Sequence, residues 1–153
     1  MISKLKKISP LVMLMLLSTL SCGVKKNTTT PIFRHINLNF GERIELGDNF
    51  DDKEYLVNII AESHFLKSTY FVGAESIEII LDDKKNVSKI IFQYNETTEK
   101  EKKIKSYTED FGTPTLESGK AIWNDGKTQF EIYSLLLNDK EVIYSKLIDM
   151  NKN

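Results

Sequence analysis

Apolar residues recur at helical spacing in two stretches of the chain. The first stretch, residues 48–62, begins with acidic residues, which are typical of the N-terminal end of a helix. Its apolar positions share one helical stripe: Tyr55, Leu56, Ile59 and Ile60. This pattern predicts a first helix over residues 48–62.

A second helix is predicted to begin at Thr98, because Glu101 completes a capping box with it. Gly112 and Pro114 follow as stop signals. Its expected apolar stripe is Ile104, Tyr107 and Phe111. Two pairs have the spacing of ion pairs on a helix surface: Glu99 with Lys103, and Glu101 with Lys105.

Strands are predicted where apolar and polar residues alternate between turn-forming residues. The Asp125-Gly126 pair is a strong hairpin signal among these turns. The expected strands are residues 69–72, 76–81, 87–94, 120–123, 128–137 and 141–148, with a further edge strand within residues 33–46.

The predicted order is a helix followed by three strands, twice, over residues 48–94 and 98–148. It indicates an α+β fold: one antiparallel sheet with both helices packed on one face. Either an internal duplication or a coincidence within a meandering fold would account for the similarity of the two units. We expect a single domain over residues 32–149, with residues 150–153 as a tail.

The first 21 residues have the three parts of an export signal. Three lysines precede an apolar run, residues 11–17, and small residues follow it. The apolar stretch is shorter and more interrupted than the about 20 residues that a membrane-spanning helix needs. We therefore expect residues 1–21 to be a signal peptide that is removed.

The sequence Thr19-Leu20-Ser21-Cys22 resembles the lipobox of bacterial lipoproteins, and Cys22 is the only cysteine of the chain. The resemblance implies cleavage before Cys22, diacylglycerol on its thiol, and a location in the bacterial cell envelope on either membrane. The usual lipobox has Leu where this chain has Thr19, and a small residue where it has Leu20. Thr19 and Ser21 also suit an ordinary signal peptidase, which would leave Cys22 as a free N-terminal thiol.

Residues 22–31 are polar and lack periodicity, which predicts a flexible tether after the lipid anchor. The full chain has 21 basic and 22 acidic residues. Because the signal peptide contains three lysines and no acidic residue, 18 basic and 22 acidic residues remain, a net charge of about −4. This balance argues against nucleic acid as a partner, since nucleic acid favours a basic surface.

Residues 41–149 resemble, in their pattern, two groups of small exported bacterial proteins. These are the β-lactamase inhibitor proteins, built from tandem helix-plus-antiparallel-sheet units, and the small lipoprotein that assists the assembly of outer-membrane barrels. Leu46-Gly47, before the acidic start of the first predicted helix, looks like the beginning of a repeat in the second group. The resemblance implies a fold, and no binding residue follows from it.

Motifs for catalysis or metal binding are scarce. His35 and His64 are the two histidines, and neither has a partner at zinc-ligand spacing. The motifs of serine hydrolases and of phosphate-binding loops are absent from the sequence. No metal and no cofactor are expected. The enzymatic hypothesis that remains is a carboxylate-dependent hydrolase that uses Glu78, Asp125 and Glu131. It predicts a cleft in which two of these acids converge and one of them has a raised pKa.

Two predicted strands, within residues 77–81 and 130–137, have apolar residues on both faces. If the helices cover one face only, Ile80, Tyr133 and Leu135 point outward and offer a partner surface; packing within a central strand is the alternative.

The leading hypothesis is a non-catalytic binding or scaffold module, held at the membrane by its lipid, that recognises an unidentified protein through this face. An inhibitor or immunity-type protein that blocks a specific enzyme is the second hypothesis, and the carboxylate-dependent hydrolase is the third.

Overall fold

The computed structural model describes residues 26–95 and 98–152. The expected signal peptide and Cys22 lie outside the described residues. Within those ranges, no helix has both the length and the apolar character needed to cross a membrane.

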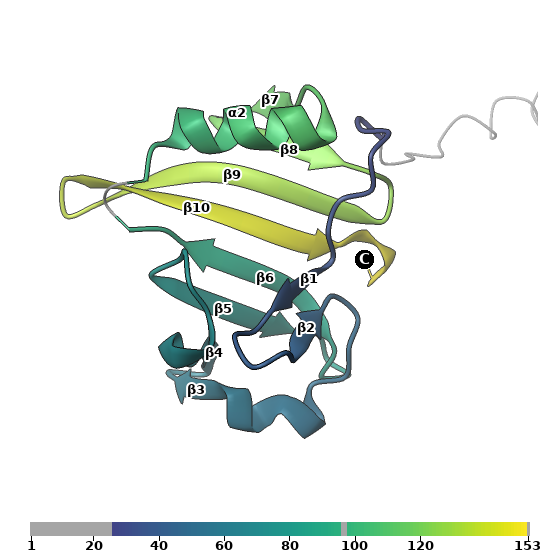
Figure 1. Ribbon diagram of the computed structural model, residues 1–153, viewed down its shortest axis with the longest axis vertical. Helices are drawn as coiled ribbons and strands as arrows, with labels where there is room; N and C mark the ends of the chain where they lie inside the picture. Colours follow the sequence, from purple (N-terminus) through teal and green to yellow (C-terminus); the bar gives the residue numbers. More distant parts are fainter. Residues whose placement is uncertain (1–25, 96–97, 153) are drawn as a thin grey trace, which may run out of the picture.

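The described chain is mostly β structure. Its main strands are β3 (Val57–Ile60), β4 (Ser63–Leu66), β5 (Ser76–Leu81), β6 (Val87–Gln93), β7 (Thr115–Glu117), β8 (Lys120–Asn124), β9 (Thr128–Leu137) and β10 (Lys140–Asp149). They form one antiparallel sheet in the order β3-β4-β5-β6-β10-β9-β8-β7 (Figure 1). Each half is a four-stranded meander, and the last strands of the two halves, β6 and β10, pair at the centre.

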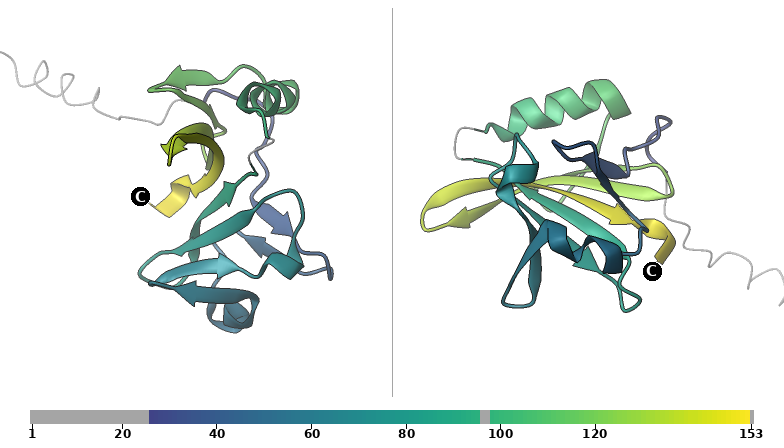
Figure 2. Two further views of the ribbon diagram at one scale, coloured as in Figure 1. Left: turned by 90° about the vertical axis from the view of Figure 1, so that its left-hand side faces the viewer. Right: turned by 60° about the horizontal axis from the view of Figure 1, so that its bottom comes forward.

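Two elements cover one face of this sheet. Helix α2 (Lys100–Phe111) lies over the half that contains β8 and β9, and a hairpin of β1 (His35–Asn37) and β2 (Arg43–Glu45) lies over the other half. Figure 2 shows that the helix and the hairpin are on the same side of the sheet. Three short 3₁₀ segments complete the described elements: η1 (Asp51–Leu56), η2 (Ser68–Tyr70) and η3 (Met150–Lys152).

The covered face holds the hydrophobic core, because alternate residues of each strand point toward the helix and the hairpin. Cross-strand partners such as Ile79 with Ile90, and Phe130 with Leu147, are fully buried there. Under α2, the rings of Tyr107 and Phe130 meet edge to face with centroids 4.6 Å apart, and Trp123 donates a hydrogen bond to the carbonyl of Gly112 (2.7 Å). Aromatic contacts of this kind therefore attach α2 to β8 and β9.

The segment before β1 is attached to the opposite end of the chain. The Arg34 guanidinium donates to the carboxylate of Asp149 (3.1 Å), to Thr128 Oγ1 (2.8 Å) and to two backbone carbonyls. The Asp149 side chain is only 2% exposed, so this ion pair is shielded from water. A buried carboxylate needs such a partner, and Arg34 therefore fixes where the N-terminal segment crosses the sheet.

The beginning of the described chain is also held in place. The backbone N–H groups of Asn27 and Thr28 both donate to the carbonyl of Asn124 in β8. The Thr28 hydroxyl donates to the carbonyl of Phe111, at the end of α2 (2.6 Å). These residues belong to the stretch expected to be a flexible tether, residues 22–31, and their hydrogen bonds attach them to the folded domain.

The predicted α+β class is wrong, because the sheet has eight strands and one α-helix packs on it within the described residues. The first predicted helix, residues 48–62, contains instead η1, β3 and the turn into β4. Ala61 and Glu62 in this turn have positive φ angles, 47° and 71°, which close a two-residue hairpin loop. Ala and Glu are unusual in such a loop, so the sequence carried no turn signal there.

Other local predictions were confirmed or corrected in detail. The strand over residues 76–81 and the strand over residues 128–137 match β5 and β9, and the second helix was confirmed as α2. The expected strand at residues 69–72 is replaced by η2, and residues 33–46 form the separate β1–β2 hairpin. The predicted capping box at Thr98 is wrong, because the Thr98 hydroxyl donates to the Asn95 side chain and Glu99 is the N-cap, without a side-chain cap bond.

Replacing Arg34 with Met (Arg34→Met) should lower the free energy of unfolding by about 3–5 kcal/mol, because Asp149 would remain buried without its cation. Arg43→Met is the matched control. Arg43 pairs with Glu45 at the surface with 62% of its side chain exposed, so its loss should cost less than about 1 kcal/mol. Urea denaturation of the full chain measures both values. Equal losses for the two variants would contradict the role given to Arg34.

Candidate ligand-binding site

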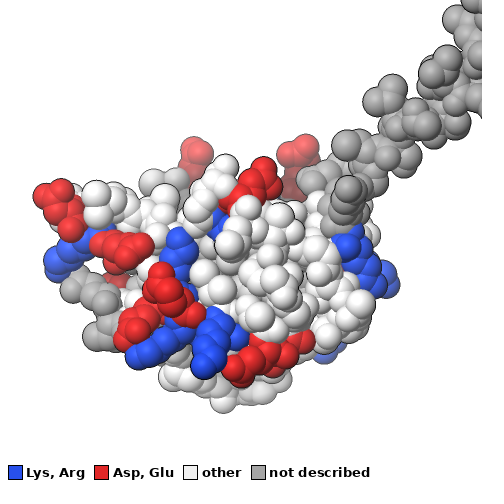
Figure 3. All heavy atoms as spheres, turned by 90° about the horizontal axis from the view of Figure 1, so that it is seen from above, with Lys and Arg blue, Asp and Glu red and all other residues white. Residues whose placement is uncertain are grey.

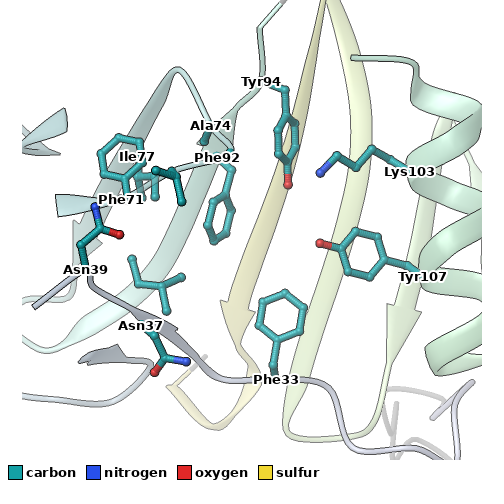
Figure 4. Close-up of a pocket in the computed structure, with 13 residues that line it drawn as sticks. Phe33, Asn37, Asn39, Phe71, Ala74, Ile77, Phe92, Tyr94, Lys103 and Tyr107 are labelled. Carbon is teal, nitrogen blue, oxygen red and sulfur yellow. The ribbon is translucent and has the colours of Figure 1, made fainter. Parts of the chain in front are cut away.

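A cavity of about 330 Å³ opens between the two covers of the sheet. We call it the seam cavity and define it by its lining residues: Phe33, Ile36, Asn37, Asn39, Phe71, Val72, Gly73, Ala74, Ile77, Phe92, Tyr94, Lys103 and Tyr107. Strands β5 and β6 supply its floor, α2 one wall, and the β1 region with the loop before β5 the other (Figure 4). Its size lies in the usual range of small-ligand pockets, about 300–1,000 Å³.

Aromatic side chains dominate the lining of the seam cavity. Phe92 on the floor stacks in parallel with Tyr94, with ring centroids 6.5 Å apart. The ring centroids of Phe33 and Tyr107 are 6.2 Å apart, and this contact connects the cavity to the aromatic cluster under α2. Figure 4 shows Phe33, Phe92 and Tyr107 gathered around the same space. Such walls suit a flat or aliphatic apolar group.

The opposite wall is fixed by the β1–β2 turn. The Asn39 backbone N–H donates to the carbonyl of Tyr70 (2.9 Å), and its side-chain amide donates to the carbonyl of Thr69 (3.3 Å). Phe40 packs edge to face on Tyr70, with centroids 4.8 Å apart. The turn is therefore attached to η2.

Lys103 is the charged residue of the cavity lining. Its ammonium lies 4.0 Å from the centre of the Tyr94 ring, a cation–π contact. Burial lowers the pKa of Lys103 below the usual lysine value, because removal from water disfavours the charged form. Among the described residues, no carboxylate forms an ion pair with Lys103; Glu99, its expected partner, pairs with Lys102 instead (2.6 Å).

Two tyrosine hydroxyls meet beside Lys103. The Tyr94 hydroxyl is 2.8 Å from the buried Ser145 hydroxyl, and the Tyr107 hydroxyl faces it across the cavity (Figure 4). Burial raises the pKa of Tyr94 and that of Tyr107, so both phenols are neutral and remain hydrogen-bonding groups at physiological pH. The cavity therefore combines apolar walls with a small polar group at one side.

The register of the sheet places Ile80, Tyr133 and Leu135 on the uncovered outer face, on strands β5 and β9. Tyr133 stacks on Tyr144, with centroids 5.5 Å apart, and two lysines approach its ring. Leu135 is 47% exposed, near the end of the β9–β10 hairpin. Charged side chains thus interrupt the apolar residues of this face, which is not one continuous apolar patch.

Glu131 lies on the outer face of β9, between Lys120 and Lys146, and its carboxylate is 3.2 Å from each ammonium. Burial by itself raises the pKa of Glu131, but the charge of Lys146 and hydrogen bonds from Gln129 and both lysines outweigh it. The pKa of Glu131 is therefore below its ordinary value, and this side chain is an ionised structural group.

Asp125 lies in the turn between β8 and β9, where its carboxylate accepts three backbone N–H bonds, from Ile32, Lys127 and Thr128. Burial opposes ionisation, yet these bonds and the charge of Arg34 hold the pKa of Asp125 below its usual value. Glu78 on β5 is separated from Glu131 by β6 and β10, about 14 Å at the usual strand spacing. The three acids considered for hydrolysis do not converge.

No metal-binding group is found in the described residues: no three His, Cys, Asp or Glu side chains gather where they could hold an ion. His35 lies in β1 and His64 in β4, in two different sheets. Seen from above, over α2 and β7, lysines and acidic residues are interspersed along one side, with a broad uncharged area beside them (Figure 3). Positive and negative side chains are therefore mixed on this face, and neither sign forms a large patch.

Comparisons with models of protein families, with curated proteins and with solved structures find no match for this chain. Its function is therefore inferred from the geometry of the seam cavity. The sequence patterns assigned Tyr107 to the core and Lys103 to a surface ion pair, so neither was expected in a site. Their spacing of four residues, which places both on one side of α2, was the available signal.

Glu131→Gln should lower the free energy of unfolding by about 1–3 kcal/mol at pH 7, because two lysines would lose their counter-charge. Since the pKa of Glu131 is lowered by folding, its contribution is complete above its unfolded pKa of about 4.3 and is lost as the pH falls through the folded value. The difference between the two proteins should therefore shrink below about pH 4.

Chemical denaturation at several pH values measures this difference. Glu117→Gln, at an exposed position of β7, is the control and should change stability by less than about 0.5 kcal/mol. A difference that persists unchanged down to pH 3 would show that Glu131 acts by packing rather than by charge.

Proposed function

We propose that this chain is a non-catalytic binding module of a bacterial cell envelope, and that it holds a small apolar ligand in the seam cavity. The observation that carries the proposal is the cavity itself: about 330 Å³, with aromatic walls contributed by segments far apart in the sequence. A water-sized unit fills about 30 Å³, so the cavity has room for roughly ten non-hydrogen atoms. The ligand is thus a small molecule, of the size of a bicyclic aromatic compound.

Among the described residues, Glu78, Asp125 and Glu131 do not converge, which supports binding over hydrolysis. Glu131 and Asp125 are held ionised by their partners, whereas a catalytic acid needs a raised pKa. The lining residues of the seam cavity supply one lysine, tyrosine hydroxyls and amides, without a carboxylate or a histidine. These groups can orient a ligand, and general acid–base chemistry by a carboxyl–histidine set has no place there.

Protein recognition is the second candidate function. Leu135, Leu136 and Leu137 are all exposed in succession at the end of the β9–β10 hairpin, next to the outer face. Successive exposed leucines at a hairpin tip favour a protein contact. A binding module and an inhibitor or immunity-type protein would both use such a contact.

Attachment to the membrane through Cys22 is the other part of the proposal, and the lipobox-like sequence supports it. A protein that carries acyl chains needs no further membrane-binding element, because two chains hold stably. The attachment of Asn27 and Thr28 to β8 leaves a short stretch between the lipid and the domain.

Ala74→Phe should weaken ligand binding at least tenfold, because the larger side chain would occupy the seam cavity. The probe is 2-naphthamide, a neutral bicyclic compound, titrated into the full chain and followed by the methyl NMR signals of Ile36 and Ile77, which both line the cavity. Leu136→Phe, at the exposed hairpin tip, is the control and should bind like the parent protein. If 2-naphthamide and its carboxylate analogue both leave these signals unmoved, the proposal of a ligand site is wrong.

Expression in a bacterium with radiolabelled palmitate should label the protein, and Cys22→Ser should abolish the label together with membrane association. The physical reason is that the lipid is attached to the sulfur of Cys22, which is the only cysteine of the sequence. Mass spectrometry of the mature N-terminus provides the second measurement. A free thiol at Cys22, or an unprocessed Met1, would contradict lipid attachment.

A further inference from the structure

The polar group of the seam cavity has the chemistry of an anion-binding site. Lys103 presents an ammonium to the cavity, where it lies over the face of the Tyr94 ring. Within the part of the chain that the structure describes, this ammonium forms no hydrogen bond and no ion pair, so its three N–H groups can donate to a ligand. Burial already disfavours its charged form. A ligand that brings a negative charge would therefore gain both an ion pair and charge-assisted hydrogen bonds.

Tyr107 supplies a second donor on the same side. The Tyr94 hydroxyl is hydrogen-bonded to the buried Ser145 hydroxyl, and the Tyr107 hydroxyl faces the space beside Tyr94 and Lys103 (Figure 4). Tyr107 lines the cavity, so its hydroxyl can donate a hydrogen bond to a ligand there. Lys103 and Tyr107 are one helical turn apart, close enough to share one small anionic group.

The charge of the ligand follows from the same residues. The lining of the seam cavity contains one cation and no other charged side chain, and the remaining lining groups are apolar side chains, amides and tyrosine hydroxyls. A dianion such as a phosphate monoester would bury a second charge without a partner, which is costly. A single negative charge on a compact, planar group matches Lys103 and the Tyr107 hydroxyl, and the aromatic walls match an apolar body.

We propose that the seam cavity is selective for small apolar carboxylates, with the carboxylate at Lys103 and Tyr107 and the aromatic or aliphatic body against Phe33 and Phe92. This inference rests on the proposed function and adds the chemical class of the ligand. Lys103 acts here as a specificity-determining residue, since the apolar walls bind the body of a neutral analogue as well.

The test compares 2-naphthoate with 2-naphthamide, which has the same shape and no charge, by calorimetric titration of the full chain at pH 7. The parent protein should bind the carboxylate at least tenfold more tightly than the amide, as expected for charge-assisted hydrogen bonds in a partly buried site. Lys103→Met should remove this preference while the affinity for the amide stays within about threefold, because a Met side chain keeps much of the apolar length of the lysine stem.

Lys105→Met is the matched control, since Lys105 is exposed on the same helix and does not line the cavity. It should keep the full preference for the carboxylate. Equal affinity of the parent protein for both probes would overturn the carboxylate inference and leave the ligand site standing. A preference that survives Lys103→Met would also overturn it. Binding of neither probe would instead defeat the proposed function itself.

Discussion

The width of the sheet is the constraint on which the rest of the structure depends. Eight strands at the usual spacing of about 4.8 Å span about 34 Å, whereas a helix with its side chains is about 10–12 Å across. One helix therefore cannot cover the apolar face of this sheet. Two elements cover this face instead: α2 lies on one half and the β1–β2 hairpin on the other. The seam cavity is the gap between them.

The two covers come from distant parts of the chain, and separate contacts hold each of them. Aromatic packing with Phe130 and Trp123 holds α2, whereas the Arg34–Asp149 ion pair and the contacts of Asn39 hold the hairpin. The two covers meet through Phe33, which precedes the hairpin and contacts Tyr107 and Phe111 of α2, and the seam cavity opens beside this contact. Polar groups such as Lys103 and Tyr94 can then lie in a position that a continuous core would exclude.

The parts of the fold that the sequence predicted are those whose signals are local. Residues 76–81 and 128–137 alternate clearly between apolar and polar, and Gly112 stops α2 where a helix is expected to end. The first helix failed because Ala61-Glu62 forms a hairpin turn without Gly, Asn or Asp. The seam cavity could not be predicted from the sequence, because Phe33, Phe92 and Lys103 come together only when β6 pairs with β10 in the folded sheet. Lys103 itself was assigned to Glu99, which prefers Lys102.

The bonds of Asn27 and Thr28 to β8 have a consequence for a lipid-bearing form of the molecule. Four residues lie between Cys22 and Asn27, which makes five steps along the chain. An extended chain advances at most about 3.3–3.6 Å per residue, so the connection between the lipid and the domain is about 18 Å long at most. The domain would then stay within a thin layer next to the bilayer, with the end of β8 that binds Asn27 held closest to the lipid. Compounds that concentrate at the membrane surface would meet the protein at a much higher effective concentration than those dissolved in the bulk fluid.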